Sequence, residues 1–267
     1  MIGKALLAGA GSSVRDGPLC RCATSPPPLC DGGERAWDRR RCLATHPPPA
    51  RFRSLLHNAP VKPRDLFWKG TRRTYVTADT HFGDAIAFRK FKRPFTSVEA
   101  CDEAMVAAIN ERVGVRDVLL HVGDLFGERE WTRGEKRHAA ALRDRIRCRK
   151  IVLVTGNTDP VGERWFDRLV HDAHDVLTWR GWPGEEKSRV VACHYPLRQW
   201  QGWPSGAVHL YGHVHGTLPE LDRSTDVGVD CWGYRPLDLA ALLADLRKRP
   251  FTCPTTWPRG QAMRAAP

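Results

Sequence analysis

Residues 74–83 read TYVTADTHFG, a short apolar and β-branched run that ends in an aspartate and, two positions later, a histidine. Such a run predicts a buried β-strand with polar side chains at its carboxyl end. The pattern recurs twice, because apolar runs over 118–122 and 151–155 precede Gly123-Asp124 and Gly156-Asn157. Three predicted strands therefore end in side chains that are able to ligate a metal ion.

Helical patterns separate these strands. Residues 97–113 predict an amphipathic helix that begins with a capping box formed by Thr96 and Glu99. A second, strongly charged helix is predicted over 134–147. The apolar face of the first helix would comprise Val98, Cys101, Met105, Ile109 and Val113. Short apolar strands that alternate with helices predict a parallel sheet within an α/β fold.

The second half of the chain has a different pattern. Strands are predicted there with little helix between them, which favours a more antiparallel arrangement. Their ranges are 176–179, 189–193, 208–211 and 226–229. A helix over 237–246 is expected to close the fold before Pro250.

The two ends of the chain differ in composition from its middle. Residues 1–70 contain two triple-proline runs and one triple-arginine run, and they predict a disordered basic arm. Folded structure is predicted over 71–250, followed by a loose tail over 251–267. The arm holds 12 basic and 5 acidic residues, a net charge of +7 out of +12 for the whole chain. Such an arm can contact nucleic acid, although a solvated arm is the simpler interpretation.

The sequence predicts a cytoplasmic protein with no membrane partner. No stretch approaches the ~18 apolar residues that span a bilayer, and the first residues make a poor signal peptide. Disulfides are therefore not expected among the nine cysteines. The four cysteines within the first 42 residues are interpreted as free thiols, with a zinc site as the alternative.

Five chain segments contribute aspartate, histidine or asparagine side chains after predicted strands. Ligands of open α/β sheets bind at the carboxyl ends of the strands, so these side chains are expected at one edge. Imidazole suits Zn, Fe, Mn or Ni, and carboxylate or amide oxygens suit Mn or Mg. Seven ligands are too many for one tetrahedral ion and suit two ions that share a carboxylate. The candidate ligands are Asp79, His81, Asp124, Asn157, His194, His213 and His215.

Five motifs occur in order along the chain. They are Asp79-x-His81, Gly123-Asp124-x-x-Gly127, Gly156-Asn157-x-Asp159, His194 and Gly212-His213-x-His215. Together they resemble the calcineurin-like metallophosphoesterase superfamily over about residues 72–240. Two further stretches, RPF at 93–95 and VDCWGYRP at 229–236, are similar to a small bacterial and phage branch of that superfamily.

The resemblance implies a four-layer αββα sandwich of two mixed sheets flanked by helices. It also implies two divalent ions, with Mn first and Ni, Zn, Fe or Mg as alternatives. Asp79, His81 and His215 would bind one ion, and Asn157, His194 and His213 the other, with Asp124 as the bridge. The implied activity is hydrolysis of a phosphomonoester or phosphodiester by metal-bound hydroxide, with Asp124, Asn157, His194 and His213 as catalytic residues.

The chain departs from the family pattern at Thr158, where many members carry a histidine that is thought to protonate the leaving group. Threonine cannot act as an acid near neutral pH, although its hydroxyl can donate a hydrogen bond. Thr158, Arg93 and Arg198 are candidate substrate contacts. Asp159 is interpreted either as a cap of the next turn or as a support for Asn157, and His121 as a packed residue.

Two alternative functions stay open. The first is a binding or scaffold protein on the same fold with weakened catalysis, because the usual histidine is replaced by Thr158. The second is a nuclease guided by the basic arm. Trp200 and Trp203 lie between the late histidine motifs and are either substrate-facing or packed.

Overall fold

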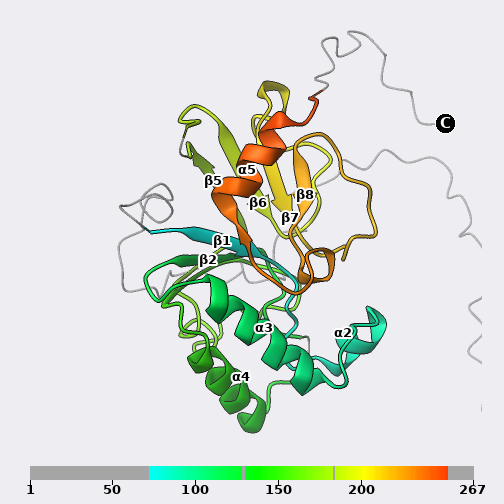
Figure 1. The fold of residues 1–267 in the computed structure, drawn as a ribbon. Helices are drawn as coiled ribbons and strands as arrows, with labels where there is room; N and C mark the ends of the chain where they lie inside the picture. The colour runs from blue at the N-terminus through cyan, green and yellow to red at the C-terminus, as the bar shows by residue number, and fades with distance from the viewer. Residues whose placement is uncertain (1–71, 128–129, 183, 252–267) are drawn as a thin grey trace, which may run out of the picture. The chain divides into compact units, whose positions relative to one another are not determined.

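The computed structural model describes residues 72–127, 130–182 and 184–251 (Figure 1). The described part thus starts close to the predicted beginning of the folded region. The arm predicted over 1–70 lies outside the described residues, as does the predicted tail apart from Phe251. Within the described ranges, no helix is both long and apolar enough to cross a membrane.

The first sheet contains the three strands that end in the early motifs. Its order is β4-β3-β2-β1-β9, in which β1 to β4 are parallel and β9 is antiparallel to β1. Its strands are β1 (Thr74–Thr77), β2 (Val118–His121), β3 (Lys150–Val154), β4 (Asp172–His174) and β9 (Leu237–Asp238). The parallel arrangement predicted for the first three strands is confirmed. The sequence did not indicate β4, whose three residues are only half-buried.

The second sheet has the order β5-β6-β7-β8. Its strands are β5 (Val176–Arg180), β6 (Arg189–Cys193), β7 (Val208–Tyr211) and β8 (Ser224–Asp226). Only β5 and β6 pair antiparallel, so the predicted antiparallel half is wrong for the other two pairings. The connections after β6 and β7 are long enough for parallel crossovers. They lack an α-helix, which is why their sequence did not indicate a crossover.

The last predicted strand of this half, over 226–229, is also misplaced. The strand β8 ends at Asp226, and Val229–Cys231 form the short 3-10 helix η2. The chain leaves the sheet there because Gly228 and Val229 pair with Ala78 at the end of β1. This crossing joins the two sheets beside the ends of β1 and β7.

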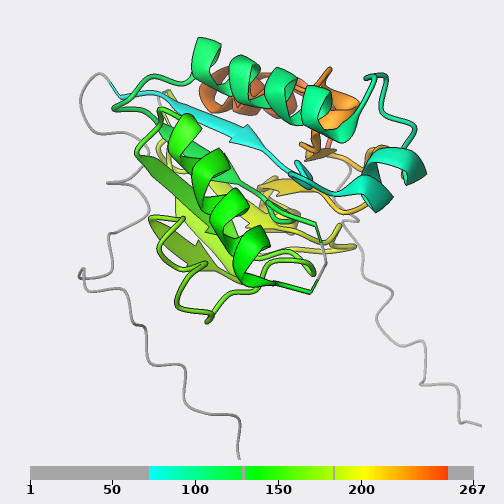
Figure 2. The same ribbon diagram turned by 90° about the horizontal axis from the view of Figure 1, so that it is seen from below.

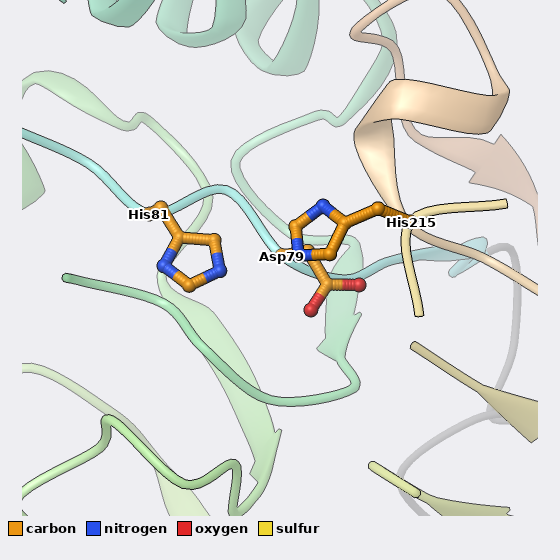
Figure 3. Close-up of side chains that lie close together, drawn as sticks. All are labelled: Asp79, His81 and His215. Carbon is orange, nitrogen blue, oxygen red and sulfur yellow. The ribbon is translucent and has the colours of Figure 1, made fainter. Parts of the chain in front are cut away.

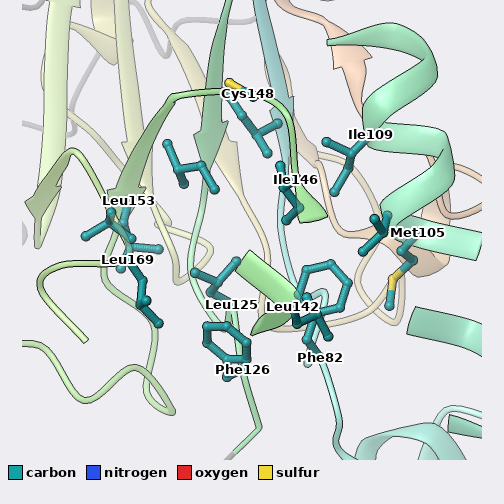
Figure 4. Close-up of a cluster of buried hydrophobic side chains, with 14 of the residues drawn as sticks. Phe82, Met105, Ile109, Leu125, Phe126, Leu142, Ile146, Cys148, Leu153 and Leu169 are labelled. Atoms are coloured by element: carbon teal, nitrogen blue, oxygen red, sulfur yellow. The ribbon is translucent and has the colours of Figure 1, made fainter. Parts of the chain in front are cut away.

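Two α-helices cover one face of the first sheet (Figure 2). They are α3 (Val98–Arg112) and α4 (Arg133–Arg145). Their apolar faces pack on β2 and β3 in a core that includes Met105, Ile109, Leu142 and Leu153 (Figure 4). The capping box predicted at Thr96 is wrong. Ser97 caps α3 instead, because its hydroxyl accepts the amide proton of Ala100.

A second core lies between the two sheets. It combines inward side chains of β1, β2, β3, β6 and β7 with four leucines of α5 (Leu239–Lys248), which packs against β1, β7 and β9. The helix predicted over 237–246 therefore exists, but its first two residues form β9 instead. Two mixed sheets with flanking helices confirm the expected fold class.

The outer face of the second sheet is covered by the segment after β6. Trp200 is buried against Val191 and donates its indole N–H to the carbonyl of Ala207. Trp203 begins the 3-10 helix η1 (Trp203–Ser205) and donates to Asp222. Trp200 is buried and Trp203 half-buried, and both indoles are hydrogen-bonded within the fold, which favours the packed interpretation.

Candidate metal centre

The candidate ligands lie on sharp turns that follow the strands. One residue separates Asp79 from the end of β1, two separate Asp124 from the end of β2, and one separates His213 from the end of β7. Eight non-glycine residues in the described part of the chain have a left-handed backbone, and five of them are candidate ligands. These five are Asp79, His81, Asp124, His213 and His215. A left-handed conformation costs about 1–2 kcal/mol per residue, and such strain concentrates at functional sites.

Asp79, His81 and His215 form the first triad (Figure 3). Their potential ligand atoms all lie within 4.8 Å of one another. The imidazole rings of His81 and His215 are stacked with centroids 5.4 Å apart. Both oxygens of Asp79 accept the backbone N–H of His213 at 3.0 Å, which connects the first triad to the turn after β7.

Asp124, His194 and His213 form the second triad, again with ligand atoms within 4.8 Å. Asn157 belongs to it, because its Oδ1 lies 2.9 Å from His213 Nδ1 and 3.2 Å from His194 Nε2. His194 is completely buried and its Nδ1 contacts the carbonyl oxygen of Val122. His213 and Asn157 are exposed, so this triad opens to solvent.

Asp124 lies between the two triads. Its Oδ2 is 3.4 Å from His81 Nε2 and 3.5 Å from His194 Nε2. Its other oxygen accepts the backbone N–H of Thr158. One carboxylate thus reaches ligands of both triads, which is the geometry that a bridging ligand requires.

Electrostatic interactions link these groups. Burial raises the pKa of Asp79 well above its ordinary value, and Asp226 and Asp124 raise it further. Burial also acts to raise the pKa of Asp124, but the hydrogen bond and charge of His194 outweigh it and lower that pKa. Burial lowers the pKa of His194, yet Asp124 outweighs burial and raises this pKa to about 8. The site is a cluster of carboxylates and imidazoles, and a bound cation would offset the negative charge of the buried carboxylates.

Two observations show that the residues fit metal ions. Both ring nitrogens of His81 are buried without a hydrogen-bond partner, although such atoms are normally paired. The glycines before the ligands also leave room for carboxylates. A Cβ on Gly156 would come within 2.2 Å of Asp124 Oδ1, and one on Gly212 within 2.4 Å of Asp79 Oδ2.

Asp159 supports the loops that carry Asp124 and Asn157. Its carboxylate accepts the backbone N–H groups of Asp124, Leu125 and Gly156, each at 2.9 Å. Burial raises the pKa of Asp159 to about 6. The structure therefore favours the interpretation of Asp159 as a support for Asn157.

The hydroxyl of Thr158 is already used within the fold. It donates to the carbonyl oxygen of Phe126 at 2.6 Å. His121, the last residue of β2, is buried, and its Nε2 pairs with the hydroxyl of Thr80 at 2.9 Å. Burial lowers the pKa of His121 to about 3, so this ring is neutral near pH 7. His121 is a packed residue, as predicted.

Arg93 is buried and its guanidinium is hydrogen-bonded within the fold, which favours a structural role over the predicted substrate contact. It is 5% exposed, and its guanidinium donates to the carbonyls of Asp79 and Thr80 and to the carboxylate of Asp230. Four hydrogen bonds thus hold the guanidinium within the fold. Arg198 is exposed, and its contact with a substrate stays a prediction.

Four residues near the triads escaped the sequence analysis. Asp230 Oδ2 lies 2.7 Å from His215 Nδ1, and Asp84 Oδ2 lies 3.6 Å from His81 Nδ1. Phe91 stacks on His215, and Tyr195, 45% exposed, packs edge-on against His213. The sequence feature that could have identified Tyr195 is its position directly after the candidate ligand His194. Asp230 lies within the 229–236 stretch, whose role the sequence alone did not reveal.

The chain is distantly similar to other proteins in sequence and in structure. No protein-family model matches the chain. An uncharacterized protein from Methanocaldococcus jannaschii is 23% identical over 183 residues, which span 66% of this chain and 93% of that protein. A solved structure of a protein of unknown function from Aquifex aeolicus aligns with a TM-score of 0.48 and 17% identity, over 62% of this chain and 95% of its own.

A second solved structure, nuclease MPE from Pseudomonas putida, aligns with a TM-score of 0.36 and 24% identity. The alignment covers 54% of this chain and 62% of the nuclease. Neither alignment carries an argument about activity. Two Asp/His triads on a fold of two mixed sheets are typical of metallophosphoesterases, in agreement with the resemblance seen in the motifs.

Proposed function

We propose that this protein hydrolyses a phosphate monoester or diester with two divalent metal ions, one in each triad. The observation that carries the proposal is the place of Asp124, whose Oδ2 lies within 3.5 Å of a histidine of each triad. Two bound ions would polarise the phosphoryl group and lower the pKa of a bound water. Manganese is the first ion to test, followed by Ni, Zn, Fe and Mg.

The residues of the second triad would face the phosphate. His213, Asn157 and Tyr195 are the exposed groups around this triad, so a substrate arrives on their side. Burial lowers the pKa of His213, and the charges of His194 and Lys90 lower it further. His213 is therefore a neutral ligand at pH 7. Lys90, exposed nearby, adds positive charge that attracts a phosphate ester.

Neither Thr158 nor His121 is placed to protonate a leaving group. Thr158 donates its hydroxyl to Phe126, and His121 has a pKa of about 3 and is sealed in the core. General acid help is worth about 10²–10⁴ in rate. We therefore propose that the favoured substrates are esters or anhydrides whose leaving groups depart without a proton.

The test is a panel of phosphate esters on metal-stripped protein that is reloaded with one ion at a time. The panel includes aryl monoesters, aryl diesters, a phosphoanhydride, an alkyl monoester and a DNA oligonucleotide. Asp124→Asn removes the shared ligand charge, and His138→Asn is the matched control because His138 is exposed on α4, outside the triads. We expect hydrolysis that requires metal, that Asp124→Asn abolishes and that His138→Asn leaves unchanged.

The outcomes separate the alternatives. A protein that binds both ions and hydrolyses nothing would support the scaffold function instead. Hydrolysis of the oligonucleotide alone would identify a nuclease. Hydrolysis that survives Asp124→Asn would place the chemistry elsewhere and end the proposal.

A further inference from the structure

The stretches 93–95 and 229–236 lie against each other beside the first triad, although Arg93 and Asp230 are 137 residues apart. Arg93 Nε and Nη2 donate to the two carboxylate oxygens of Asp230, each at 3.1 Å. Phe95 packs edge-on against Tyr234 with centroids 4.8 Å apart, and the Arg93 guanidinium lies over the Tyr234 ring at 5.8 Å. We call the pair of Arg93 and Asp230 the clamp.

The clamp holds the turn that carries Asp79 and His81. Arg93 Nη2 donates to the carbonyl of Asp79 and Nη1 to the carbonyl of Thr80, both at 2.7 Å. On the other side, the N–H groups of Asp79 and His81 donate to carbonyls of residues 123 and 124 at 3.0 Å. Asp79 and His81 have φ values of 56° and 46°, which L-residues seldom adopt. The turn stays in this conformation because hydrogen bonds hold it on both sides.

The clamp also orients His215. Asp230 Oδ2 accepts a hydrogen bond from His215 Nδ1 at 2.7 Å, which leaves Nε2 as the ring's free ligand atom. The His215 side chain is 5% exposed, and Phe91 stacks on its other face. The ring therefore has one orientation, set by Asp230 and Phe91.

We propose that Arg93 and Asp230 are positioning residues for the metal ion of the first triad, because together they hold the turn that carries Asp79 and His81 and orient His215. The proposal rests on the proposed function only in requiring that the triads bind metal. A buried ion pair contributes little net stability, since desolvation of both charges offsets their attraction. Its contacts with Asp79, Thr80 and His215 indicate a role at the site instead.

Arg143 provides a matched control. Like Arg93, it is an arginine whose guanidinium donates to several backbone carbonyls, here those of Leu169, Ile146 and Cys148. It ties the end of α4 to the loop before β3 and to Leu169, and it belongs to neither triad. Replacement of either arginine by lysine keeps the charge and removes the planar fork that makes several hydrogen bonds at once.

The experiment titrates metal-free wild type, Arg93→Lys, Asp230→Asn and Arg143→Lys with Co²⁺ against a competing chelator. Visible absorption and bound-ion stoichiometry are measured, and far-UV circular dichroism confirms folding. Loss of a hydrogen-bond partner of a metal ligand typically costs about 10–100-fold in metal affinity. We expect Arg93→Lys and Asp230→Asn each to weaken the binding of one of the two ions by that factor and to change the Co²⁺ spectrum of that site. The affinity for the other ion should not change. Arg143→Lys should lower the melting temperature and leave both affinities unchanged.

Wild-type affinity for both ions in folded Arg93→Lys and Asp230→Asn would overturn the proposal, and so would an equal loss in Arg143→Lys. If Arg93→Lys does not fold, Asp230→Asn decides alone, because it keeps the shape and one oxygen of the carboxylate. Wild type that binds two ions but hydrolyses no ester would end the proposed function and leave the clamp intact.

Discussion

The two triads have similar ligands but different surroundings. The first is enclosed: Asp79 and His81 are 0% and 7% exposed, and Arg93, Asp230 and Asp84 support its ligands. The second is enclosed on one side only, where His194 is buried, whereas His213 and Asn157 are exposed. A ligand set fixed by neighbouring hydrogen bonds holds its ion more tightly than one that faces water. The difference suggests one ion that stays and one that exchanges and meets the substrate.

The largest effect should come from the residue that the triads share. Asp124→Asn removes the negative charge between His81 and His194 while it keeps the side-chain shape. Because a metal supplies several kcal/mol of transition-state stabilisation, we expect kcat/KM to fall by about 10³-fold or more. Elemental analysis after dialysis should show fewer than two ions. Two retained ions would mean that the triads are independent.

The next effect concerns the exposed second triad, where the proposed substrate would react. Thr158→His should supply the missing acid and raise the rate on alkyl esters by about 10²-fold, the low end of general acid catalysis. Rates on aryl esters should change little, because their leaving groups need no proton. The measurement is log rate against leaving-group pKa for both proteins, with the chemical step shown to be rate-limiting. Equally shallow slopes would show that wild type already has an acid.

The two triads should also release their ions at different rates. A mild chelator added to the two-metal protein should remove the ion of the second triad first, with at least about a tenfold difference in affinity, or about 1.4 kcal/mol. His213→Asn should speed the first phase of release only, and His215→Asn the second phase only. A single phase in wild type, or equal effects of both variants, would remove the distinction between the triads.

Much of this comparison could be predicted from the sequence, because strand-end chemistry is local. Short apolar runs predicted β1, β2 and β3, and the residues after them include Asp79 and Asp124. The carboxyl ends of the predicted strands placed the ligands at one sheet edge, and the family resemblance implied their division into two sets. The structure brings Asp79, His81 and His215 together, and likewise Asp124, His194 and His213.

The features that the sequence did not predict depend on contacts between segments that are distant along the chain. Arg93 looked like a substrate contact because its partner Asp230 lies 137 residues further along the chain. The parallel pairing of β6 with β7 has no local signal, since the crossover is a loop with a 3-10 helix. The cap of α3 at Ser97 is one residue from the predicted one, a distinction that only the backbone geometry settles.

The smallest effect on hydrolysis should come from His209 in the second sheet. Protonation of His209 at low pH would destabilise the fold and so limit the pH range over which the two triads can be compared. Its Nδ1 donates to the carbonyl of Val191 and its Nε2 accepts the N–H of Leu197, each at 3.1 Å. Burial lowers the pKa of His209 to about 4, although hydrogen bonds to the backbone oppose it. A proton on Nε2 would face the N–H of Leu197, so two donors would point at each other.

The sign of the pH dependence follows from this lowered pKa. Unfolded, the ring binds a proton near pH 6.5, so its contribution to stability is complete above that pH and is lost as the pH falls towards 4. At pH 5 the loss relative to pH 8 is about 2 kcal/mol. His209→Gln cannot titrate, so it should be less stable than wild type at pH 8 by about 1 kcal/mol for the lost hydrogen bond. It should nevertheless lose less stability between pH 8 and pH 5. Urea unfolding of metal-free protein at both pH values measures the difference without contribution from metal release, and parallel losses in the two proteins would show that His209 does not set the acid limit.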